Sequence, residues 1–94
     1  MELKEQIKTG RVLVDFYADW CGPCRMLGKR LEQFENDTTD VKVIKVNVET
    51  EQELSNQFGV RSIPALFYME DGDIINKASG NKTIEELKQL TKTN

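Results

Sequence analysis

The chain contains two cysteines, Cys21 and Cys24, which stand three positions apart. A mainly apolar run at residues 12–17 precedes them and is typical of a buried strand. A Cys-x-x-Cys pair that follows a strand and opens a helix predicts a dithiol that cycles with a disulfide. No other group of residues in the sequence indicates chemistry as strongly as this pair.

The predicted helix start gives the two cysteines different roles. Residues i and i+3 on a first turn lie on one face with Cα atoms about 5–6 Å apart, which suits a disulfide. Cys21 would lie at the helix N-terminus, where unpaired N–H groups and the helix dipole favour its thiolate, so we expect it to be the nucleophile. Cys24 is expected to face the protein body, to be less exposed and to act as the resolving thiol.

Gly22 and Pro23 fit a redox pair better than its two alternatives, a zinc site and a static disulfide. Proline suits a first helical turn, and glycine lets another backbone approach Cys21. Zinc needs four ligands, but the chain has no third cysteine and no histidine, so only a metal shared across a dimer is left open. A structural disulfide closing so short a loop would stabilise the fold little.

Periodicity and turn signals predict an α/β fold with a central mixed sheet of about four strands flanked by helices. The expected elements are a short helix from Leu3 to Gly10, strands at 11–17 and 41–48, a helix from the motif to about residue 36, a helix from a Thr50–Glu53 capping box to Phe58, a hairpin of 65–69 and 73–77 around Asp71-Gly72, and a last helix capped by Thr83 and Glu86. In the long helix, Met26, Leu27, Leu31 and Phe34 form an apolar stripe and are expected in the core.

Asp15 is the second informative residue, because its neighbours in the strand are apolar. Alternation places it on one face with Leu13 and Tyr17. A buried carboxylate is costly unless it is paired or protonated, so we expect its pKa to be raised. The alternative is an edge-strand aspartate that reaches solvent.

The motif and its surroundings resemble the thioredoxin family. The matching segments are Trp-Cys-Gly-Pro-Cys at 20–24 behind Val-Asp-Phe-Tyr-Ala-Asp, Lys-Val-Asn-Val-Glu at 45–49, Phe58–Ala65, the Asp71-Gly72 turn and Ser-Gly-Asn at 79–81. The resemblance covers about residues 11–92 and keeps the spacing throughout. It implies the thioredoxin fold, although the family's first strand has no counterpart before Arg11, so residues 41–48 are expected to form an exposed edge. That edge is either tolerated or used to pair two copies.

The resemblance also assigns roles to individual residues. It makes Asp15 the general base for Cys24, through a water, and places Lys45 beside it, although Lys45 could equally extend into solvent. Sequence alone favours a trans Ile63–Pro64 bond, whereas the resemblance implies a cis bond that faces the cysteines. The backbone of Ile63 would then pair with an extended client segment. A small apolar docking patch would comprise Trp20, Gly22, Pro23, Ile63, Pro64 and Gly80.

The implied function is reduction of protein disulfides by a cycle between the Cys21–Cys24 dithiol and its disulfide, with electron transport from a thioredoxin reductase that draws on NADPH or ferredoxin. Clients would be proteins with disulfides, and no further cofactor would be bound. Two alternatives stay open: a glutaredoxin-like or oxidising protein, and a thioredoxin-fold subunit that clamps a larger partner without catalysis. The Gly-Pro dipeptide argues, by resemblance, against an oxidising protein.

Length and charge restrict the remaining function classes. Ninety-four residues predict one domain, 1–94, and a net charge of −3 with interspersed signs argues against nucleic-acid binding. The first ten residues lack the apolar core of a signal peptide, and no run approaches a membrane span. We therefore expect a cytoplasmic monomer without a membrane partner, a setting in which a lone cysteine pair is more often catalytic than structural.

Overall fold

The computed structural model describes residues 3–93 and shows an α/β arrangement within them. The elements in chain order are α1 (Leu3–Gln6), β1 (Arg11–Tyr17), α2 (Gly22–Asp37), β2 (Lys42–Asn47), α3 (Gln52–Gln57), β3 (Ala65–Glu70), β4 (Asp73–Ser79) and α4 (Ile84–Leu90). The sheet order is β2-β1-β3-β4, with β1 parallel to β2 and antiparallel to β3, and β3 antiparallel to β4. The four-stranded mixed sheet expected from the sequence is confirmed.

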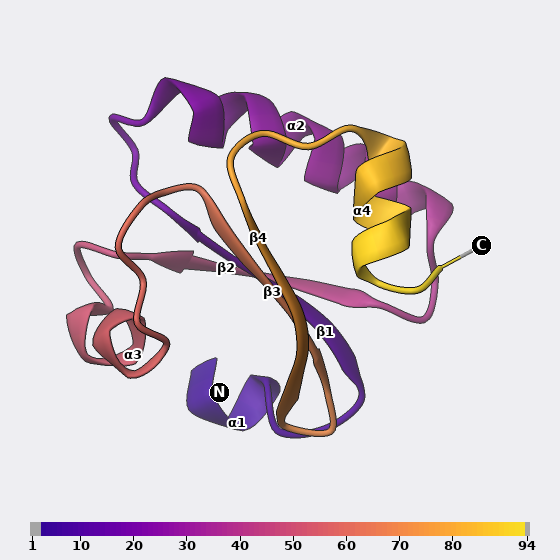
Figure 1. Ribbon diagram of the computed structural model, residues 1–94, viewed down its shortest axis with the longest axis horizontal. Helices are drawn as coiled ribbons and strands as arrows, with labels where there is room; N and C mark the ends of the chain where they lie inside the picture. The colour runs from indigo at the N-terminus through magenta and orange to yellow at the C-terminus, as the bar shows by residue number, and fades with distance from the viewer. Residues whose placement is uncertain (1–2, 94) are drawn as a thin grey trace.

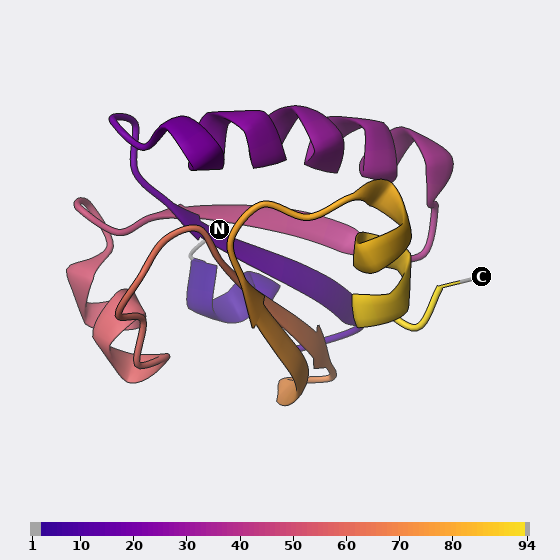
Figure 2. The ribbon, with the colours of Figure 1, turned by 45° about the horizontal axis from the view of Figure 1, so that its top comes forward.

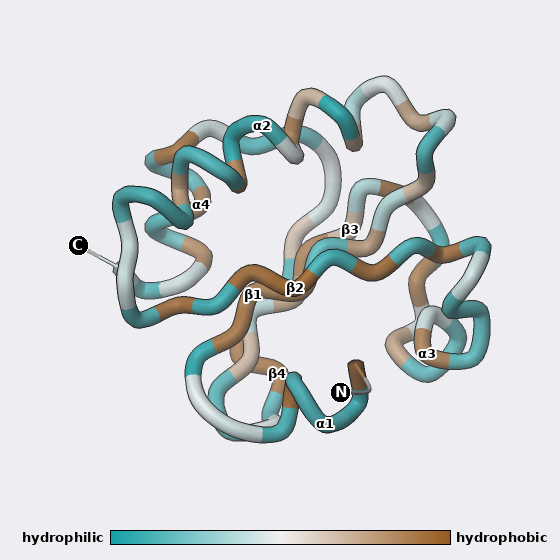
Figure 3. Tube along the Cα trace, turned by 180° about the vertical axis from the view of Figure 1, so that it is seen from behind, coloured by the Kyte–Doolittle hydropathy of each residue, from teal (hydrophilic) through white to brown (hydrophobic). Residues whose placement is uncertain are grey.

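The sheet forms the middle of three layers. Helices α2 and α4 cover one face, and α1 and α3 lie on the other (Figures 1 and 2). Hydrophobic residues gather along the central strands, whereas many residues of the helices are hydrophilic (Figure 3). Because both faces are covered, β1 is buried along its interior rather than alternating between core and solvent.

Two apolar clusters occupy the spaces between these layers. Val12, Val14 and Phe16 point to the α1 and α3 side, where Phe16 packs its ring against those of Phe58 and Phe67. The intervening positions of β1 point to α2 and α4, so that Leu13 packs with residues of both helices. Asp15 belongs by alternation to this second face.

Residues 3–93 contain no helix long and apolar enough to cross a membrane.

Strand β2 lies at an edge of the sheet, as the family resemblance implies. Its register with β1 pairs Leu13 with Val43 and Asp15 with Lys45. The lysines Lys42 and Lys45 are exposed along this edge. Charged side chains on an edge strand disfavour pairing with a second chain.

Met26 contradicts its expected place in the core, because it is 57% exposed. The buried face of α2 contains Cys24, Leu27, Leu31 and Phe34. Met26 lies one position before Leu27, which turns it by about 100° away from that face in a helix of 3.6 residues per turn. The apolar type of Met26 suggests a place in the stripe, but its angle around the helix axis turns it to solvent.

The expected Thr50–Glu53 capping box is also wrong. Helix α3 has Glu51 as its N-cap, without a side-chain capping bond. The chain leaves β2 through a turn in which the Asn47 side-chain oxygen accepts from the Glu49 N–H at 2.8 Å. The Thr50 hydroxyl donates back to the Asn47 carbonyl at 3.4 Å, so the turn uses the group that would have capped the helix.

The capping box at the last helix is confirmed. The Thr83 hydroxyl accepts from the Glu86 N–H at 3.1 Å, and the Glu86 carboxylate accepts from the Thr83 N–H at 3.0 Å. Two N–H groups that lack partners within the helix are thereby satisfied.

We predict that Thr83→Ala lowers the free energy of unfolding by about 1 kcal/mol, because side-chain N-caps contribute about 0.5–2 kcal/mol. Urea unfolding measures the change. Thr50→Ala is the matched control and should change stability by less than about 0.5 kcal/mol, since Thr50 caps no helix. Equal losses in the two variants would contradict this assignment of the caps.

Candidate active site

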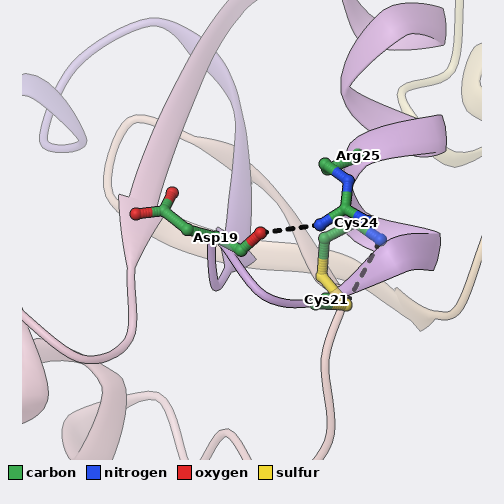
Figure 4. The surroundings of a disulfide bond; sticks show 4 residues. All are labelled: Asp19, Cys21, Cys24 and Arg25. Atoms are coloured by element: carbon green, nitrogen blue, oxygen red, sulfur yellow. Dashed lines mark hydrogen bonds between the residues drawn. A yellow bond between two sulfur atoms is a disulfide. The ribbon is translucent and has the colours of Figure 1, made fainter.

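Cys21 and Cys24 form a disulfide across the start of α2. Cys21 is the N-cap of the helix, and the Cys24 N–H donates to the Cys21 Sγ at 3.2 Å (Figure 4). The Cα atoms are 5.2 Å apart, within the range expected for two residues on one helical turn. Cys21 and Cys24 are 6% and 3% exposed, so the expectation that Cys24 is the less exposed of the two is confirmed.

The loop before Cys21 is held by two bonds. The Cys21 N–H donates to the Ala18 carbonyl at 3.2 Å, and the Arg25 guanidinium donates to the Asp19 carbonyl at 2.8 Å (Figure 4). Arg25 thus connects the first turn of α2 back to the loop that enters it. The sequence gives no signal for this role of Arg25, because a bond to a backbone carbonyl does not depend on the type of the partner side chain.

The Ile63–Pro64 peptide bond is cis, as the family resemblance implies. Ile63 packs against the cluster of Ala18, Cys21 and Cys24, so the structure brings this segment to the disulfide. The Pro64 carbonyl accepts from the Gly80 N–H at 2.9 Å. Gly80 has φ +82°, a conformation that side chains rarely adopt, which accounts for glycine at this position.

Trp20 and Pro23 are exposed beside the disulfide, and Trp20 keeps 67% of its surface accessible. Trp20 and Ile63 line a hollow of about 370 Å³ together with Val60 and Arg61. Exposed large apolar groups that surround a hollow are typical of binding surfaces. Of the residues expected to form a docking patch, the structure brings Trp20 and Ile63 to one hollow, whereas the Pro64 side chain is buried. The part of the patch in client recognition stays a prediction.

Asp15 is fully buried in the centre of β1, so it does not reach solvent. Neither carboxylate oxygen has a hydrogen-bond partner among the described residues. Burial removes the hydration of the charged form and raises the pKa of Asp15 to about 6, against a smaller lowering effect of the Lys45 charge. A carboxyl with this pKa can gain and lose a proton near neutral pH.

Lys45 has features of both alternatives that the sequence leaves open, a place beside Asp15 and a side chain that extends into solvent. The residue is exposed on the edge strand, yet its Nζ lies over the Tyr17 ring, 5.0 Å from the centroid. It is the register partner of Asp15, and its charge acts on that carboxyl. In residues 3–93 the two groups do not approach within ion-pair distance, so the interaction is longer in range than a salt bridge.

A second hollow, of about 320 Å³, adjoins Cys24. Tyr17, Gly28 and Lys45 line it together with the charged residues Asp19, Arg25, Lys29 and Glu32. It gives Cys24 and Lys45 a common, solvent-facing boundary. Within the described part of the chain, no group of three or more metal-ligating side chains occurs.

A disulfide that closes across one helical turn, beside an apolar segment that another chain can approach, is suited to exchange with a foreign disulfide. This geometry defines a thiol–disulfide oxidoreductase on an α/β scaffold.

Comparison with known proteins gives the particular family. A family model for thioredoxin matches residues 1–93, and the chain belongs to the thioredoxin family. It is 40% identical to a thioredoxin of Mycoplasmoides gallisepticum over 92 residues, covering 97% of this chain and 92% of that one. It is 40% identical to a thioredoxin of Bacillus subtilis over 86 residues, covering 90% and 83%.

Solved structures agree with this assignment. A mutant thioredoxin from Halobacterium salinarum NRC-1 superposes with a TM-score of 0.88 at 38% identity, covering 97% of this chain and 80% of that one. The oxidised form of mitochondrial thioredoxin 3 from Saccharomyces cerevisiae superposes with a TM-score of 0.86 at 29% identity, covering 95% and 84%. The predicted thioredoxin fold and protein-disulfide reductase activity are thereby confirmed.

We predict that Asp15→Asn stabilises the fold in a pH-dependent way. The carboxyl has a pKa of about 6 when buried and an ordinary value of 3.8, so the folded state holds the extra proton between these values. Stability therefore falls as the pH rises from 3.8 to about 6, by about 3 kcal/mol in total. Asparagine cannot ionise and escapes this loss.

Urea unfolding below pH 3.8 and above pH 6 measures the effect. The gain in stability of Asp15→Asn should be about 3 kcal/mol larger at the higher pH. Comparing the two conditions cancels the packing difference between the carboxyl and the amide. A gain that does not vary with pH would show that Asp15 is not charged and buried in the folded state.

Proposed function

We propose that this thioredoxin-family protein is a general reductant of protein disulfides that works as a cytoplasmic monomer of one domain, 1–94. The observation that carries the proposal is the Cys24 N–H directed at the Cys21 sulfur from the first turn of α2. A backbone donor at this position stabilises negative charge on sulfur, as an N-cap does for an oxygen anion. Cys21 is therefore the nucleophile of the pair.

The reaction proceeds by two exchanges. The Cys21 thiolate attacks one sulfur of a client disulfide, which forms a mixed disulfide and releases one client thiolate. Cys24 then loses its proton to Asp15, through a water, and attacks the Cys21 sulfur. The second client thiol leaves, and the Cys21–Cys24 disulfide forms. The client gains two electrons and the protein loses two.

Recharging needs a partner that returns two electrons. We assign this role to a thioredoxin reductase, drawing on NADPH or ferredoxin. The reductase attacks the Cys21–Cys24 disulfide by the same exchange in reverse, and the dithiol is restored. The cycle needs no bound cofactor in this chain.

Client recognition is assigned to the surface around the disulfide. Trp20, Pro23 and Ile63 supply apolar contact, and the cis Ile63–Pro64 segment offers its backbone to an extended client strand. The bond between the Gly80 N–H and the Pro64 carbonyl holds that segment in place. Gly22 allows the client backbone to come close to Cys21. Recognition through main-chain bonds gives broad client tolerance.

The reduction potential of the Cys21–Cys24 pair tests the direction of electron flow. Equilibration against a thiol buffer should give a value well below about −230 mV, on the reducing side of the glutaredoxins. A value near about −180 mV or above would instead indicate an oxidant or isomerase.

We predict that Asp15→Asn slows resolution of the mixed disulfide by at least about tenfold near neutral pH, since a positioned base contributes about 10²–10⁴-fold. Stopped-flow reduction of a fluorescently labelled disulfide peptide follows the step. Cys24→Ser is the control, because it should trap the mixed disulfide completely, and Cys21→Ser should form none. Unchanged resolution in Asp15→Asn would remove the base role from this carboxyl.

A further inference from the structure

Arg61 differs from the other arginines of the chain in the surroundings of its guanidinium. Arg11, Arg25 and Arg30 each donate at least one hydrogen bond to an oxygen of another residue. Arg61 is exposed and makes no hydrogen bond, ion pair or ring contact within residues 3–93. The N–H donors of its guanidinium are therefore open to a group from another molecule.

Arg61 lies beside the segment proposed to bind clients. It comes two positions before Ile63, which packs against the cysteines, and it lines the hollow of about 370 Å³ with Trp20 and Ile63. It also lines a hollow of about 360 Å³ that reaches β4 at Lys77. We call the first the Trp20 hollow and the other the Lys77 hollow. Residues 60–62 border both of them.

The charges along these two hollows are positive. Of the described residues that line the Trp20 hollow, Arg61 is the one with a charged side chain. Of those described around the Lys77 hollow, the charged ones are Arg61 and Lys77. The hollow at Cys24 is different, because acidic and basic side chains both line it. The chain as a whole has a net charge of −3, so the charge at the first two hollows is opposite in sign to that of the protein.

We propose that Arg61 is a specificity-determining residue, which makes this protein favour clients with a carboxylate side chain near the cysteine that Cys21 attacks. The proposal rests on the proposed function, in which an extended client segment pairs with the backbone of Ile63. A guanidinium forms bidentate ion pairs with carboxylates, and it repels a basic side chain at the same place. The favoured client is therefore an extended, acidic segment that carries a disulfide.

The size of this preference follows from the exposure of Arg61. Ion pairs between exposed side chains contribute little, so one client carboxylate should raise the rate of reduction about threefold, and a lysine in its place should lower the rate by a similar factor. Charge attraction also speeds the encounter of the two molecules. Both effects should weaken at 1 M salt, where the Debye length is about 3 Å.

The experiment measures how fast the dithiol form of the protein reduces a set of extended peptides. Each peptide has one cysteine, which carries an uncharged 2-thiopyridyl disulfide. The peptides differ only in having glutamate, glutamine or lysine, in turn, at each position near that cysteine. Release of 2-thiopyridone is followed by absorbance and gives a second-order rate constant at low and high salt. The parent should reduce at least one glutamate peptide about threefold faster than its glutamine counterpart, and 1 M salt should remove most of the difference.

Three variants at position 61 test the role of the charge. Arg61→Gln should reduce the glutamate and glutamine peptides at equal rates, Arg61→Glu should favour the lysine peptide, and Arg61→Lys should retain most of the parent's preference. The fold should tolerate these changes, since Arg61 has no partner to lose within residues 3–93. Every variant should also reduce bis(2-hydroxyethyl) disulfide at the parent rate, because this small disulfide carries no charge. A loss on this substrate as well would show that Arg61 supports the fold or the reaction itself, and would overturn the proposal.

Lys29→Gln is the matched control. It removes one positive charge from an exposed side chain that lines the hollow at Cys24 instead, and it should keep the parent's preference. An equal loss of preference in Lys29→Gln would show a general effect of net charge. Equal rates for glutamate and glutamine peptides in the parent would show that Arg61 is only solvated. Either result overturns the proposal but leaves the proposed function intact, whereas a parent that reduces none of the peptides would contradict the proposed function.

Discussion

The burial of β1 on both faces is the constraint on which the rest of the structure depends. An apolar cluster lies on each side of the strand, so residues that point to either face of the sheet must be apolar. Asp15 interrupts this pattern and is nevertheless fully buried. Its carboxyl cannot be hydrated as it would be at the surface, so its pKa rises to about 6. The strand then leads directly into the loop that carries Cys21. The buried carboxyl of Asp15 and the redox pair therefore lie close together along the chain.

The two ends of β1 are held in different ways. At its start, the Arg11 guanidinium contacts the Tyr68 hydroxyl, the Asp40 carboxylate and the Thr91 carbonyl, which ties β1 to β3, to the loop before β2 and to the end of α4. At its other end, backbone hydrogen bonds between residues close in sequence connect the loop after β1 to the first turn of α2. Side-chain hydrogen bonds of Arg11 thus close the end of β1 away from the disulfide. At the reactive end, the hydrogen bonds go to backbone carbonyls, including the bond from the Arg25 guanidinium to the Asp19 carbonyl.

This division suits exchange with other proteins. In the proposed reaction, backbone groups at the first turn of α2 and in the 63–64 segment interact with sulfur or with a main chain, whatever the client side chains are. Lys45, the register partner of Asp15, lines the hollow at Cys24, whereas Trp20 and Ile63 line a different hollow. The proposed client contacts and the charge that acts on Asp15 are therefore found at different hollows.

The sequence by itself determined the features that depend on near neighbours in the chain. The spacing of Cys21 and Cys24 places both on one turn, and the apolar context of Asp15 implies its burial. The Thr83 cap likewise depends on Glu86, three residues away. The tertiary structure decided what depends on contacts between distant segments. Met26 faces solvent because of its angle to the packed face of α2. The Lys45 ammonium lies over the ring of Tyr17 and beside Gly28, which belong to two other elements. Spacing along a chain determines local bonds, but the position of a long, flexible side chain depends on the surfaces that folding brings around it.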